Sequence, residues 1–531
     1  MFKIKPVIKK IVRSPLFWIF ILAFFLRIYK LASFPVGFHV DEAKVGWNAL
    51  SILKTGRDDK GNLLALYYNS FGDFRPTGIF YATIPSIILF GRSEFAVRFP
   101  SALLGALTIF PLYFLVIEFL KKQKNLTFSI QHLALTASFL LAVSPWHISV
   151  SRATSEVVIS MFIALWGIYY FLKGIDAKNK KHFILSVSLI ILSYFFYHSI
   201  RLLAPIFLLA IILYKKAFYK KAILSLFVIS FITLLLLLNK EARGRFSQVS
   251  IFSDLDVQYE LSRMPFEEGP GKVFIARMFH NKPLVYTRRL VNEYTKYFSA
   301  NFFLESTIPK PARYQTVGVG LLTYIELALF IFGLVAIAQK KFFFLPLLLL
   351  ILAPFAAALT TEDSPNLHRA LLMLPMLVII ESCGFITLWK FKKLIFALLL
   401  LNFAFFLHMY FVHNKVHLPL YRNVGAKELA VYLNKVQKDY DQIILTDIPD
   451  SPYPWLAFFT GKKPDEKFSF SGQRCPSRDA FEKPDVKRLL VVDAEGCATE
   501  SNLKARSDVK LINVIKRPDE TEVYNIWSRI E

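Results

Sequence analysis

Two adjacent carboxylates shortly after the first apolar run carry the strongest chemical signal in the sequence. Residues 37–43 read Gly-Phe-His-Val-Asp-Glu-Ala, so Asp41 and Glu42 lie just beyond that run with His39 before them. A charged residue costs roughly 2.5–3.5 kcal/mol at mid-membrane and less near the boundary. Two interpretations follow: Asp41 caps the next helix, or it is a general base or metal ligand in a partly desolvated cleft. Spacing alone leaves both open.

Three further polar clusters lie at the ends of apolar runs. The first contains Arg152 and Glu156, which are four residues apart and would share one helix face and pair there. The others are residues 197–201, which read Tyr-His-Ser-Ile-Arg, and residues 366–369, which read Asn-Leu-His-Arg. Lone arginines at the ends of spans are often anchors whose charged heads reach the interface. Each cluster therefore has a structural interpretation beside the functional one.

The clusters gain weight together, because the topology predicted below places them all at one membrane face. Arginines in a membrane-level cleft suit a phosphate, since the planar guanidinium donates two parallel hydrogen bonds. A glycine-rich nucleotide loop is absent from the sequence, which favours a lipid-linked phosphate over a soluble nucleotide. No cofactor is certain, although three histidines could share a divalent metal ion. The candidate residues are His39, Asp41, Glu42, Arg75, Arg152, Glu156, His198, Arg201, Arg243, Arg245, His368 and Arg369, the three histidines among them being the candidate metal ligands.

The composition indicates the elements that must position these residues. The chain has 531 residues, of which 55% are hydrophobic and 19% charged, too apolar for a soluble protein. A membrane-spanning helix needs roughly 20 apolar residues. We therefore predict a polytopic α-helical membrane protein with about 11 to 13 spans. The apolar bands lie at about 14–32, 99–119, 131–147, 157–172, 183–199, 202–214, 222–239, 318–338, 342–360, 369–388 and 394–411.

Basic clusters between the bands predict the orientation. They all fall in the cytoplasm if the N-terminus is cytoplasmic and the short stretch 77–91 is re-entrant or lies on the membrane surface. The basic N-terminus precedes an uncleaved first span of the plasma membrane, because no small-residue cleavage site follows it. The net charge of +25 then marks a cytoplasmic rim, and it gives no reason to invoke nucleic acid. Residues 1–411 form the transmembrane module, with outer loops at 33–76 and 240–317.

Residues 412–531 are predicted to form a small extracytoplasmic α/β domain, because charges and turns replace the apolar runs there. Residues 425–436 have helical spacing, whereas 442–445, 488–492 and 509–515 are typical of strands. Cys475 and Cys497 both lie in this region. An oxidising exterior would permit a disulfide between them, but two free thiols are equally compatible with the sequence.

With these residues in view, the chain resembles the GT-C superfamily of polyprenyl-phosphate-sugar glycosyltransferases. It is most similar to the branch of protein O-mannosyltransferases and lipid A aminoarabinose transferases. The matching pieces are residues 38–43, 74–91, 93–101 and 144–156, so the resemblance covers the first ~200 residues well. The stretch 91–101 is the most specific, and its role is expected to be structural.

The resemblance implies roles for individual residues. Asp41 matches the acidic residue of the first loop, which acts as a base toward the acceptor or contacts it, and Glu42 completes the acidic pair. Arg75 stands where relatives often carry Lys and would bind the donor phosphate, together with Arg201 and Arg369. Two departures, Thr77 in place of Pro and Glu156 in place of Asp, leave the second acidic role open.

The predicted function is therefore transfer of a sugar, with inversion, from a polyprenyl-phosphate donor in the membrane to an extracytoplasmic protein, lipid or glycan. The alternative is a transporter or flippase for a lipid-linked glycan intermediate. That alternative calls for inverted repeats and charges deep within spans, and the sequence analysis detects neither. A third interpretation, a membrane-anchored receptor, would not need so many spans.

Overall fold

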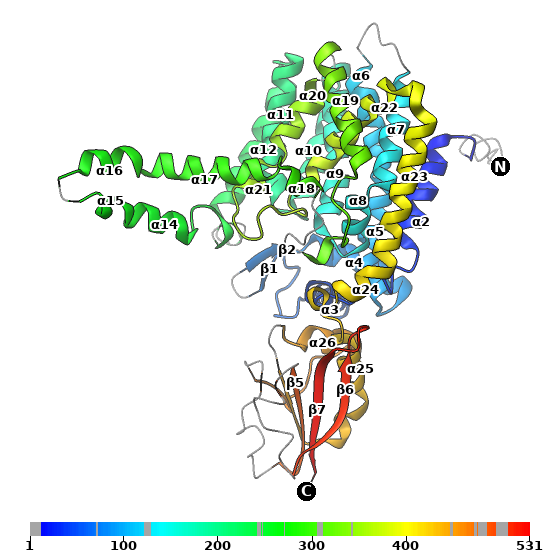
Figure 1. Ribbon diagram of the computed structural model, residues 1–531, viewed down its shortest axis with the longest axis vertical. Helices are drawn as coiled ribbons and strands as arrows, with labels where there is room; N and C mark the ends of the chain where they lie inside the picture. Colours follow the sequence, from blue (N-terminus) through cyan, green and yellow to red (C-terminus); the bar gives the residue numbers. More distant parts are fainter. Residues whose placement is uncertain are drawn as a thin grey trace. The chain divides into compact units, whose positions relative to one another are not determined.

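In the computed structural model the chain forms two compact units (Figure 1). The helical unit comprises residues 1–29, 65–79 and 101–409, and the mixed unit comprises residues 30–64, 80–100 and 410–531. The structure describes residues 12–530 except 71–72, 122–128, 240, 242–245, 247, 270, 305–311, 341–343, 447–449, 472–474, 476–485, 495–496 and 498–507.

The helical unit contains a helix at every predicted apolar band. Its helices are α2 (Pro15–Ile28), the second half of α5 (Glu94–Leu107), α6 (Ile109–Leu120), α7 (Ile130–Val143), α8 (Pro145–Arg152), α9 (Glu156–Ala177), α10 (Lys180–Tyr194), α11 (Ser199–Lys215), α12 (Lys220–Leu238), α14 (Leu255–Ser262), α15 (Met264–Glu267), α16 (Val273–Phe279), α17 (Lys282–Lys296), α18 (Ala300–Leu304), η1 (Ala312–Tyr314), α19 (Tyr324–Lys340), α20 (Phe344–Leu352), α21 (Phe355–Ala358), η2 (Leu371–Met373), α22 (Leu374–Thr387), η3 (Trp389–Phe391) and α23 (Lys392–His408). A two-stranded hairpin, β1 (Tyr67–Ser70) and β2 (Asp73–Pro76), completes the unit.

Four helical stretches are long and apolar enough to cross a membrane, namely Glu94–Leu120, Glu156–Ala177, Lys220–Leu238 and Trp389–His417. A fifth arises if α7 and α8, which are bent by 54° at Ser144, form one span. The remaining bands are shorter helices. The helical architecture with several candidate spans agrees with the predicted polytopic membrane protein, while the number of spans and their orientation stay predictions.

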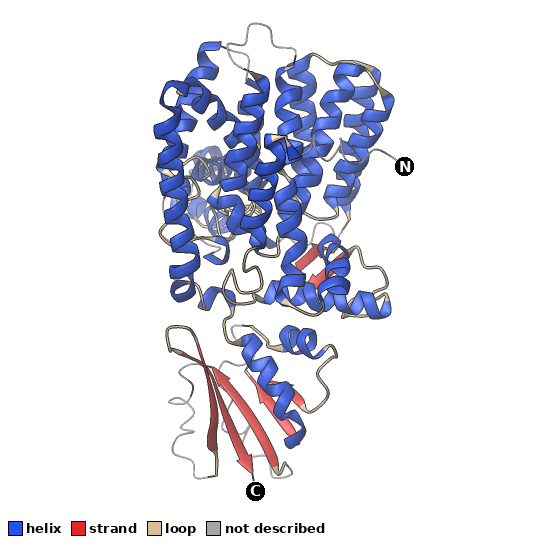
Figure 2. Cartoon of the chain, turned by 90° about the vertical axis from the view of Figure 1, so that its right-hand side faces the viewer, coloured by secondary structure: helices blue, strands red, loops and turns tan. Residues whose placement is uncertain are grey.

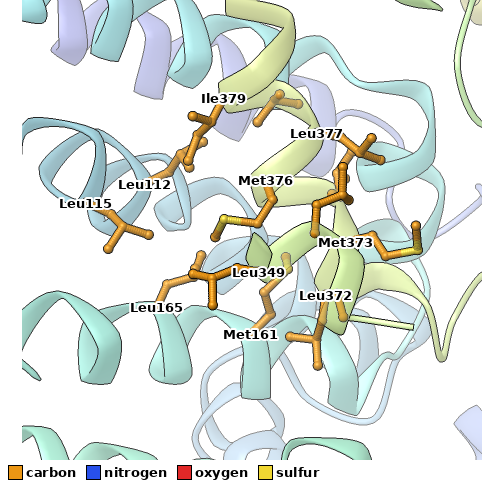
Figure 3. Close-up of a cluster of buried hydrophobic side chains, with 14 of the residues drawn as sticks. Leu112, Leu115, Met161, Leu165, Leu349, Leu372, Met373, Met376, Leu377 and Ile379 are labelled. Carbon is orange, nitrogen blue, oxygen red and sulfur yellow. The ribbon is translucent and has the colours of Figure 1, made fainter. Parts of the chain in front are cut away.

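The core of the helical unit is built from aliphatic and methionine side chains of helices far apart in the sequence (Figure 3). Leu112 and Leu115 of α6 lie in the same cluster as Met161 and Leu165 of α9. The same cluster contains Leu349 of α20 and the residues at the start of α22. This packing holds the helix ends that carry the candidate residues.

Helices α19 and α22 approach each other through two glycines. A Cβ atom added at Gly384 would lie 1.9 Å from the carbonyl oxygen of Leu329, and one at Gly333 would lie 2.0 Å from that of Ile380. Small residues permit such close approach of two helix backbones in membranes. Neither backbone can yield to a side chain at these positions without moving a whole helix.

We therefore predict that Gly384→Val destabilises the protein by several kcal/mol, because overpacking alone costs roughly 1–3 kcal/mol and here the obstacle is backbone. Thermal unfolding of the purified protein in detergent would measure this. Gly269→Asn is the control, because nothing lies within 4 Å of an added Cβ there and asparagine tolerates the left-handed φ of +86° at this position. An unfolding temperature for Gly384→Val equal to that of the control would refute the close approach.

The mixed unit combines helices with a five-stranded sheet. Its helices are α3 (Val40–Thr55), most of α4 (Gly78–Phe90), the first half of α5, η4 (Met409–His413), α24 (Asn414–His417), η5 (Leu420–Arg422), α25 (Ala426–Val436), η6 (Gln437–Asp439) and α26 (Tyr453–Thr460). Its strands are β3 (Gln442–Leu445), β4 (Phe468–Phe470), β5 (Arg488–Ala494), β6 (Lys510–Lys516) and β7 (Glu522–Ile530) (Figure 2). The strand order is β4-β3-β5-β7-β6, with β3 parallel to β4 and β5, and β7 antiparallel to β5 and β6.

The predicted elements of residues 412–531 are present: α25, β3, β5 and β6 coincide with the expected helix and strands. The further elements of this region were not predicted, namely α24, η5, η6, α26, β4 and β7. Cys475 and Cys497 form a disulfide, with their Cα atoms 5.2 Å apart. Of the two possibilities that the sequence left open, the structure therefore contains the disulfide.

One carboxyl group is buried inside this sheet. Asp493 of β5 accepts a hydrogen bond from Trp527 Nε1 at 3.0 Å, while its Oδ1 has no hydrogen-bond partner among the described residues. Burial raises the pKa of Asp493 from 3.8 to about 7, and hydrogen bonds from Trp527 and Asn525 act in the opposite direction. The folded state therefore binds this proton more tightly than the unfolded chain does.

This difference predicts a pH dependence. The contribution of Asp493 to stability is fully present below pH 4 and is lost as the pH rises through about 7. Asp493→Asn should remove that loss and stabilise the protein by roughly 1–3 kcal/mol above pH 8, with little effect near pH 4. Unfolding measured over pH 4–9 tests this, and a stabilisation that does not change with pH would contradict it.

Candidate functional site

The side chain of Glu42 is buried between two arginines of the mixed unit. Its Oε1 accepts from Arg98 Nε at 3.0 Å, and its Oε2 accepts from an Nη atom of Arg98 at 3.0 Å and of Arg422 at 2.6 Å. The side chains of Glu42, Arg98 and Arg422 are at most 3% exposed. We call these three residues the Glu42 cluster. The two positively charged guanidinium groups stabilise the ionised form of the Glu42 carboxylate, although it is buried away from water.

The same arginines also hold the backbone that leads to the acidic pair. Arg98 donates to the carbonyl oxygens of Leu31 and Gly37, and Arg422 Nε donates to that of Val36 at 3.0 Å. Trp455 Nε1 of α26 donates to the carbonyl oxygen of Phe38 at 2.7 Å. Four carbonyl groups of this segment are therefore satisfied by side chains from distant parts of the sequence.

Helix α3 begins with a cap made by His39. His39 Nδ1 accepts from the backbone N–H of Asp41 at 3.1 Å, and Glu42 Oε2 accepts from the backbone N–H of His39 at 3.1 Å. The interpretation of Asp41 as the cap is therefore wrong: the capping side chain is His39. Because Nδ1 accepts this bond, the proton of a neutral His39 lies on Nε2. Val40 N also donates to Asn423 Oδ1 at 3.0 Å, which fixes the start of the helix.

Asp41 lies in the first turn of α3, beside this cluster but less buried. Its side chain is 24% exposed, and its Oδ2 lies 3.7 Å from His39 Nδ1. The structure thus brings Asp41, Glu42 and His39 together and gives the two carboxylates different surroundings. Glu42 is neutralised by buried arginines, whereas Asp41 remains accessible to solvent.

We predict that Glu42→Gln destabilises the protein by about 3–5 kcal/mol, because it leaves two buried arginines without their counter-ion. Asp41→Asn should change stability by less than about 1 kcal/mol, since its side chain is partly exposed. Thermal unfolding of the two variants in one detergent makes the comparison. Equal stability of Glu42→Gln and the unmodified protein would contradict a structural role for Glu42.

In the helical unit, His198 and Arg201 lie together at the β1–β2 hairpin. Arg201 Nε donates to the carbonyl oxygen of Tyr194 at 3.2 Å, and its Nη1 donates to His198 Nδ1 at 3.0 Å. His198 Nε2 must then carry the proton that it donates to the carbonyl oxygen of Phe74 at 3.1 Å. Arg201 also lies over the ring of Tyr67. Burial raises the pKa of Tyr67, while the positive charge of Arg201 opposes that shift.

Arg75 is in β2 of this hairpin, opposite Tyr68 of β1. Thr77, which stands where relatives carry Pro, donates from Oγ1 to the carbonyl oxygen of Ala65 at 2.6 Å. The next residue, Gly78, donates from its backbone N–H to Phe195 at 3.1 Å. The departure at position 77 therefore has a structural role. His198 and Arg201 therefore contact the hairpin whose second strand carries Arg75.

His368 and Arg369 have separate partners in the helical unit. His368 Nε2 forms a hydrogen bond of 3.0 Å with Ser155 Oγ, and its ring stacks on Tyr314 at 4.6 Å between centroids. Arg369 donates to Thr360 Oγ1 at 2.7 Å and to Glu362 Oε2 at 2.8 Å. Both residues lie in the segment before η2 that the core holds in place.

Arg152 and Glu156 do not share a helix face, because α8 ends at Arg152 and α9 begins at Glu156. The premise of their i to i+4 pairing is therefore wrong. Arg152 donates to the carbonyl oxygens of Leu26 and Tyr29, at 2.7 Å each. These carbonyls belong to the end of α2, so Arg152 satisfies groups that a helix terminus leaves unpaired.

Two predicted residues, Arg243 and Arg245, lie outside the described residues. No group of three His, Cys, Asp or Glu side chains suited to a metal ion occurs among the residues that are described. His198 and His368 are instead bound to Arg201 and Ser155, respectively. A shared metal site for the three histidines therefore has no support from the described part of the chain.

Sequence reasoning missed the partners of Glu42. Arg98 lies in the stretch 91–101, which was expected to be structural, but its contact with Glu42 was not predicted. Arg422 comes from residues 412–531 and showed no signal, because a single arginine after an apolar run is common. Arg27 was also missed: it is buried, and one of its Nη atoms lies 2.6 Å from His147 Nδ1.

Comparison with known proteins identifies the class. Residues 75–238 match the family model described as dolichyl-phosphate-mannose-protein mannosyltransferase. No curated protein matches the chain by sequence. This family match and the fold shared with ArnT, a solved structure described below, support the resemblance inferred from the sequence.

Two solved structures give particular relatives. ArnT from Cupriavidus metallidurans, bound to undecaprenyl phosphate, is similar with a TM-score of 0.55 and 11% identity, over 98% of both chains. The archaeal oligosaccharyltransferase AglB from Archaeoglobus fulgidus, in complex with an inhibitory peptide and a dolichol-phosphate, has a TM-score of 0.48 and 14% identity. That match covers 90% of this chain and 69% of AglB. At these identities the likeness establishes the fold alone.

Proposed function

We propose that the chain is a membrane glycosyltransferase that moves a sugar from a polyprenyl-phosphate donor to an extracytoplasmic acceptor. The family match over residues 75–238 and the fold shared with ArnT support this class. The observation that carries the assignment of the base is the contrast between Asp41 and Glu42. One carboxylate is sealed by arginines and the other is accessible at the start of α3.

Asp41 fits the role of general base for geometric reasons. Its backbone is held by the His39 cap and by the Glu42 cluster, so its carboxylate is positioned before any acceptor binds. Such preorganisation is what a base within hydrogen-bond reach of an acceptor hydroxyl requires. Glu42 is a positioning residue in this proposal, because its oxygens are occupied by Arg98 and Arg422.

The donor phosphate is assigned to arginines of the helical unit. Arg75 lies in the hairpin that His198 and Arg201 support, and Arg369 lies before η2. Guanidinium groups are suited to the charge that develops on a departing phosphate. The proposal does not require a divalent metal ion, because neither the role of Asp41 nor that of the arginines depends on one.

The reaction follows from these roles. The oxygen of an acceptor hydroxyl attacks the anomeric carbon of the sugar, and Asp41 accepts the proton of that hydroxyl. The bond between the anomeric carbon and the phosphate oxygen breaks, and the polyprenyl phosphate leaves with its electron pair. A single displacement of this kind inverts the anomeric configuration. The lipid tail of the donor explains why the enzyme is a membrane protein.

The proposed arrangement in the cell keeps the predicted boundaries. Residues 1–411 form the catalytic transmembrane module, the N-terminus is cytoplasmic, and residues 412–531 are extracytoplasmic in the cell membrane. The disulfide between Cys475 and Cys497 supports an oxidising location for that region. The proposed sugar is a hexose or a pentose, and the proposed acceptor is a protein, a lipid or a glycan.

We predict that Asp41→Asn lowers transfer by about 100- to 10,000-fold, because the amide cannot accept the hydroxyl proton. Transfer is measured as acceptor-dependent release of polyprenyl phosphate from its sugar by protein in liposomes. Asp256→Asn is the matched control, since that carboxylate is 87% exposed on α14. Binding of the donor lipid, followed by native mass spectrometry, should be retained in Asp41→Asn. Turnover near that of the unmodified protein would refute the base assignment.

One observation favours the alternative of a transporter or flippase. Glu381 of α22 is completely buried, and neither of its carboxyl oxygens has a hydrogen-bond partner among the described residues. Glu381 lies within the predicted apolar band 369–388, and the sequence did not single it out. Intramembrane ionisable residues often mark ion or substrate pathways. A flippase moves the lipid across the bilayer and leaves the sugar–phosphate bond intact, so the same release assay separates the two functions.

A further inference from the structure

Helices α14 to α17 of the helical unit form an arm that extends sideways from the bundle (Figure 1). We call residues 255–296 the lateral arm. It runs across the direction of the spans, and the second view shows the same helices nearly end-on (Figure 2). The arm therefore runs parallel to the plane of a membrane that the bundle would cross.

The lateral arm is held together by ion pairs between its outgoing and returning halves. Arg289 on α17 donates to Asp254, the cap of α14, at 2.6 Å. Arg288 pairs with Glu260, and His280 Nε2 lies 3.3 Å from Glu268. These contacts make the arm a folded helical hairpin with a defined surface.

The tip of the arm exposes large apolar side chains to an unusual degree. Phe266 of α15 is 85% exposed, and Phe274 of α16 is 80% exposed. Five of the seven residues of α16 are large, apolar and exposed, and only Ala276 of that helix is buried. The exposed apolar residues of the tip are Phe266, Val273, Phe274, Ile275, Met278 and Phe279. Soluble surfaces rarely gather so many apolar side chains unless they contact a partner or a membrane.

The position of the arm in the helical unit indicates which partner covers it. Helix α12, which ends at Leu238 before the arm begins, exposes Phe227, Phe231 and Leu234 on its outer surface, as a span does toward lipid. The arm follows this lipid-facing helix after a short connection and turns across its axis. The surface of the bilayer is therefore beside the arm.

Charges on the arm complement a lipid surface. Four basic residues without an acidic partner among the described residues lie next to the apolar tip and outnumber its acidic residues, Glu267 and Glu268: they are Arg263, Lys272, Arg277 and Lys282. Interfacial helices combine exposed aromatic and aliphatic side chains with basic residues that contact anionic headgroups. From the sequence, residues 240–317 were predicted only to form an outer loop, and no role was predicted for this surface.

We propose that the lateral arm binds the interface of the bilayer, with the apolar tip among the acyl chains and the basic residues at the headgroups. The lateral arm binds the leaflet at which α12 ends. The inference does not rest on the transferase activity, because a flippase with this bundle would carry the same arm.

The test places an environment-sensitive fluorophore at Phe274→Cys, in a Cys383→Ser background, in lipid nanodiscs that hold one copy of the protein. Quenching by lipids that carry a nitroxide near the headgroup should be several-fold stronger at Phe274 than at Glu520→Cys. Glu520 lies in an exposed turn of the mixed unit, with its side chain 81% exposed. Leu401→Cys on α23, which is 67% exposed on a predicted span, is the positive control.

A second variant tests the charges. Replacing Lys272, Arg277 and Lys282 by Glu should weaken quenching at Phe274 in anionic nanodiscs and leave quenching at Leu401 unchanged. Quenching at Phe274 no greater than at Glu520 would overturn the proposal. So would a disulfide between Phe274→Cys residues of two copies in liposomes, formed with no quenching by lipid, because a second copy would then be the occupant.

Discussion

The conformation of the segment that leads into helix α3 depends on one buried carboxylate. Glu42 accepts hydrogen bonds from Arg98 and Arg422, which are 56 and 380 residues away in the sequence. Removing one member of a buried ion pair is strongly destabilising, because it leaves the remaining charges uncompensated. The capped start of α3, and with it the position of Asp41, follows from this interaction. The adjacent carboxylates therefore have different surroundings: Glu42 is enclosed by arginines, whereas the side chain of Asp41 is 24% exposed.

Much of the fold could be predicted from the sequence, because lipid imposes a simple pattern. A span must be apolar over many residues and must satisfy its own backbone, so apolar bands correspond to helices. The buried strands β3 and β5 were found for a similar reason, as each is a short continuous apolar run. Strand β7 was missed because it carries the buried polar residues Asn525, Ser528 and Arg529, which give it the composition of a loop.

The candidate site was harder to predict, because its geometry depends on contacts between distant residues. The acidic pair at 41–42 was visible in the sequence, but the burial of only one of its members was not. Arg152 and Glu156 were interpreted as helix neighbours, whereas a break in the helix separates them. His198 and Arg201 were found, yet their role in holding the β1–β2 hairpin depends on carbonyl groups that no sequence pattern identifies.

The most direct test of the central claim follows the sugar–phosphate bond itself. The purified protein is placed in liposomes with a polyprenyl-phosphate sugar labelled in both sugar and lipid, and acceptor extracts are added. A transferase separates the two labels, so free polyprenyl phosphate accumulates as labelled acceptor forms. If the two labels stay together while the lipid changes leaflet, the protein is a flippase and the account of Asp41 is wrong.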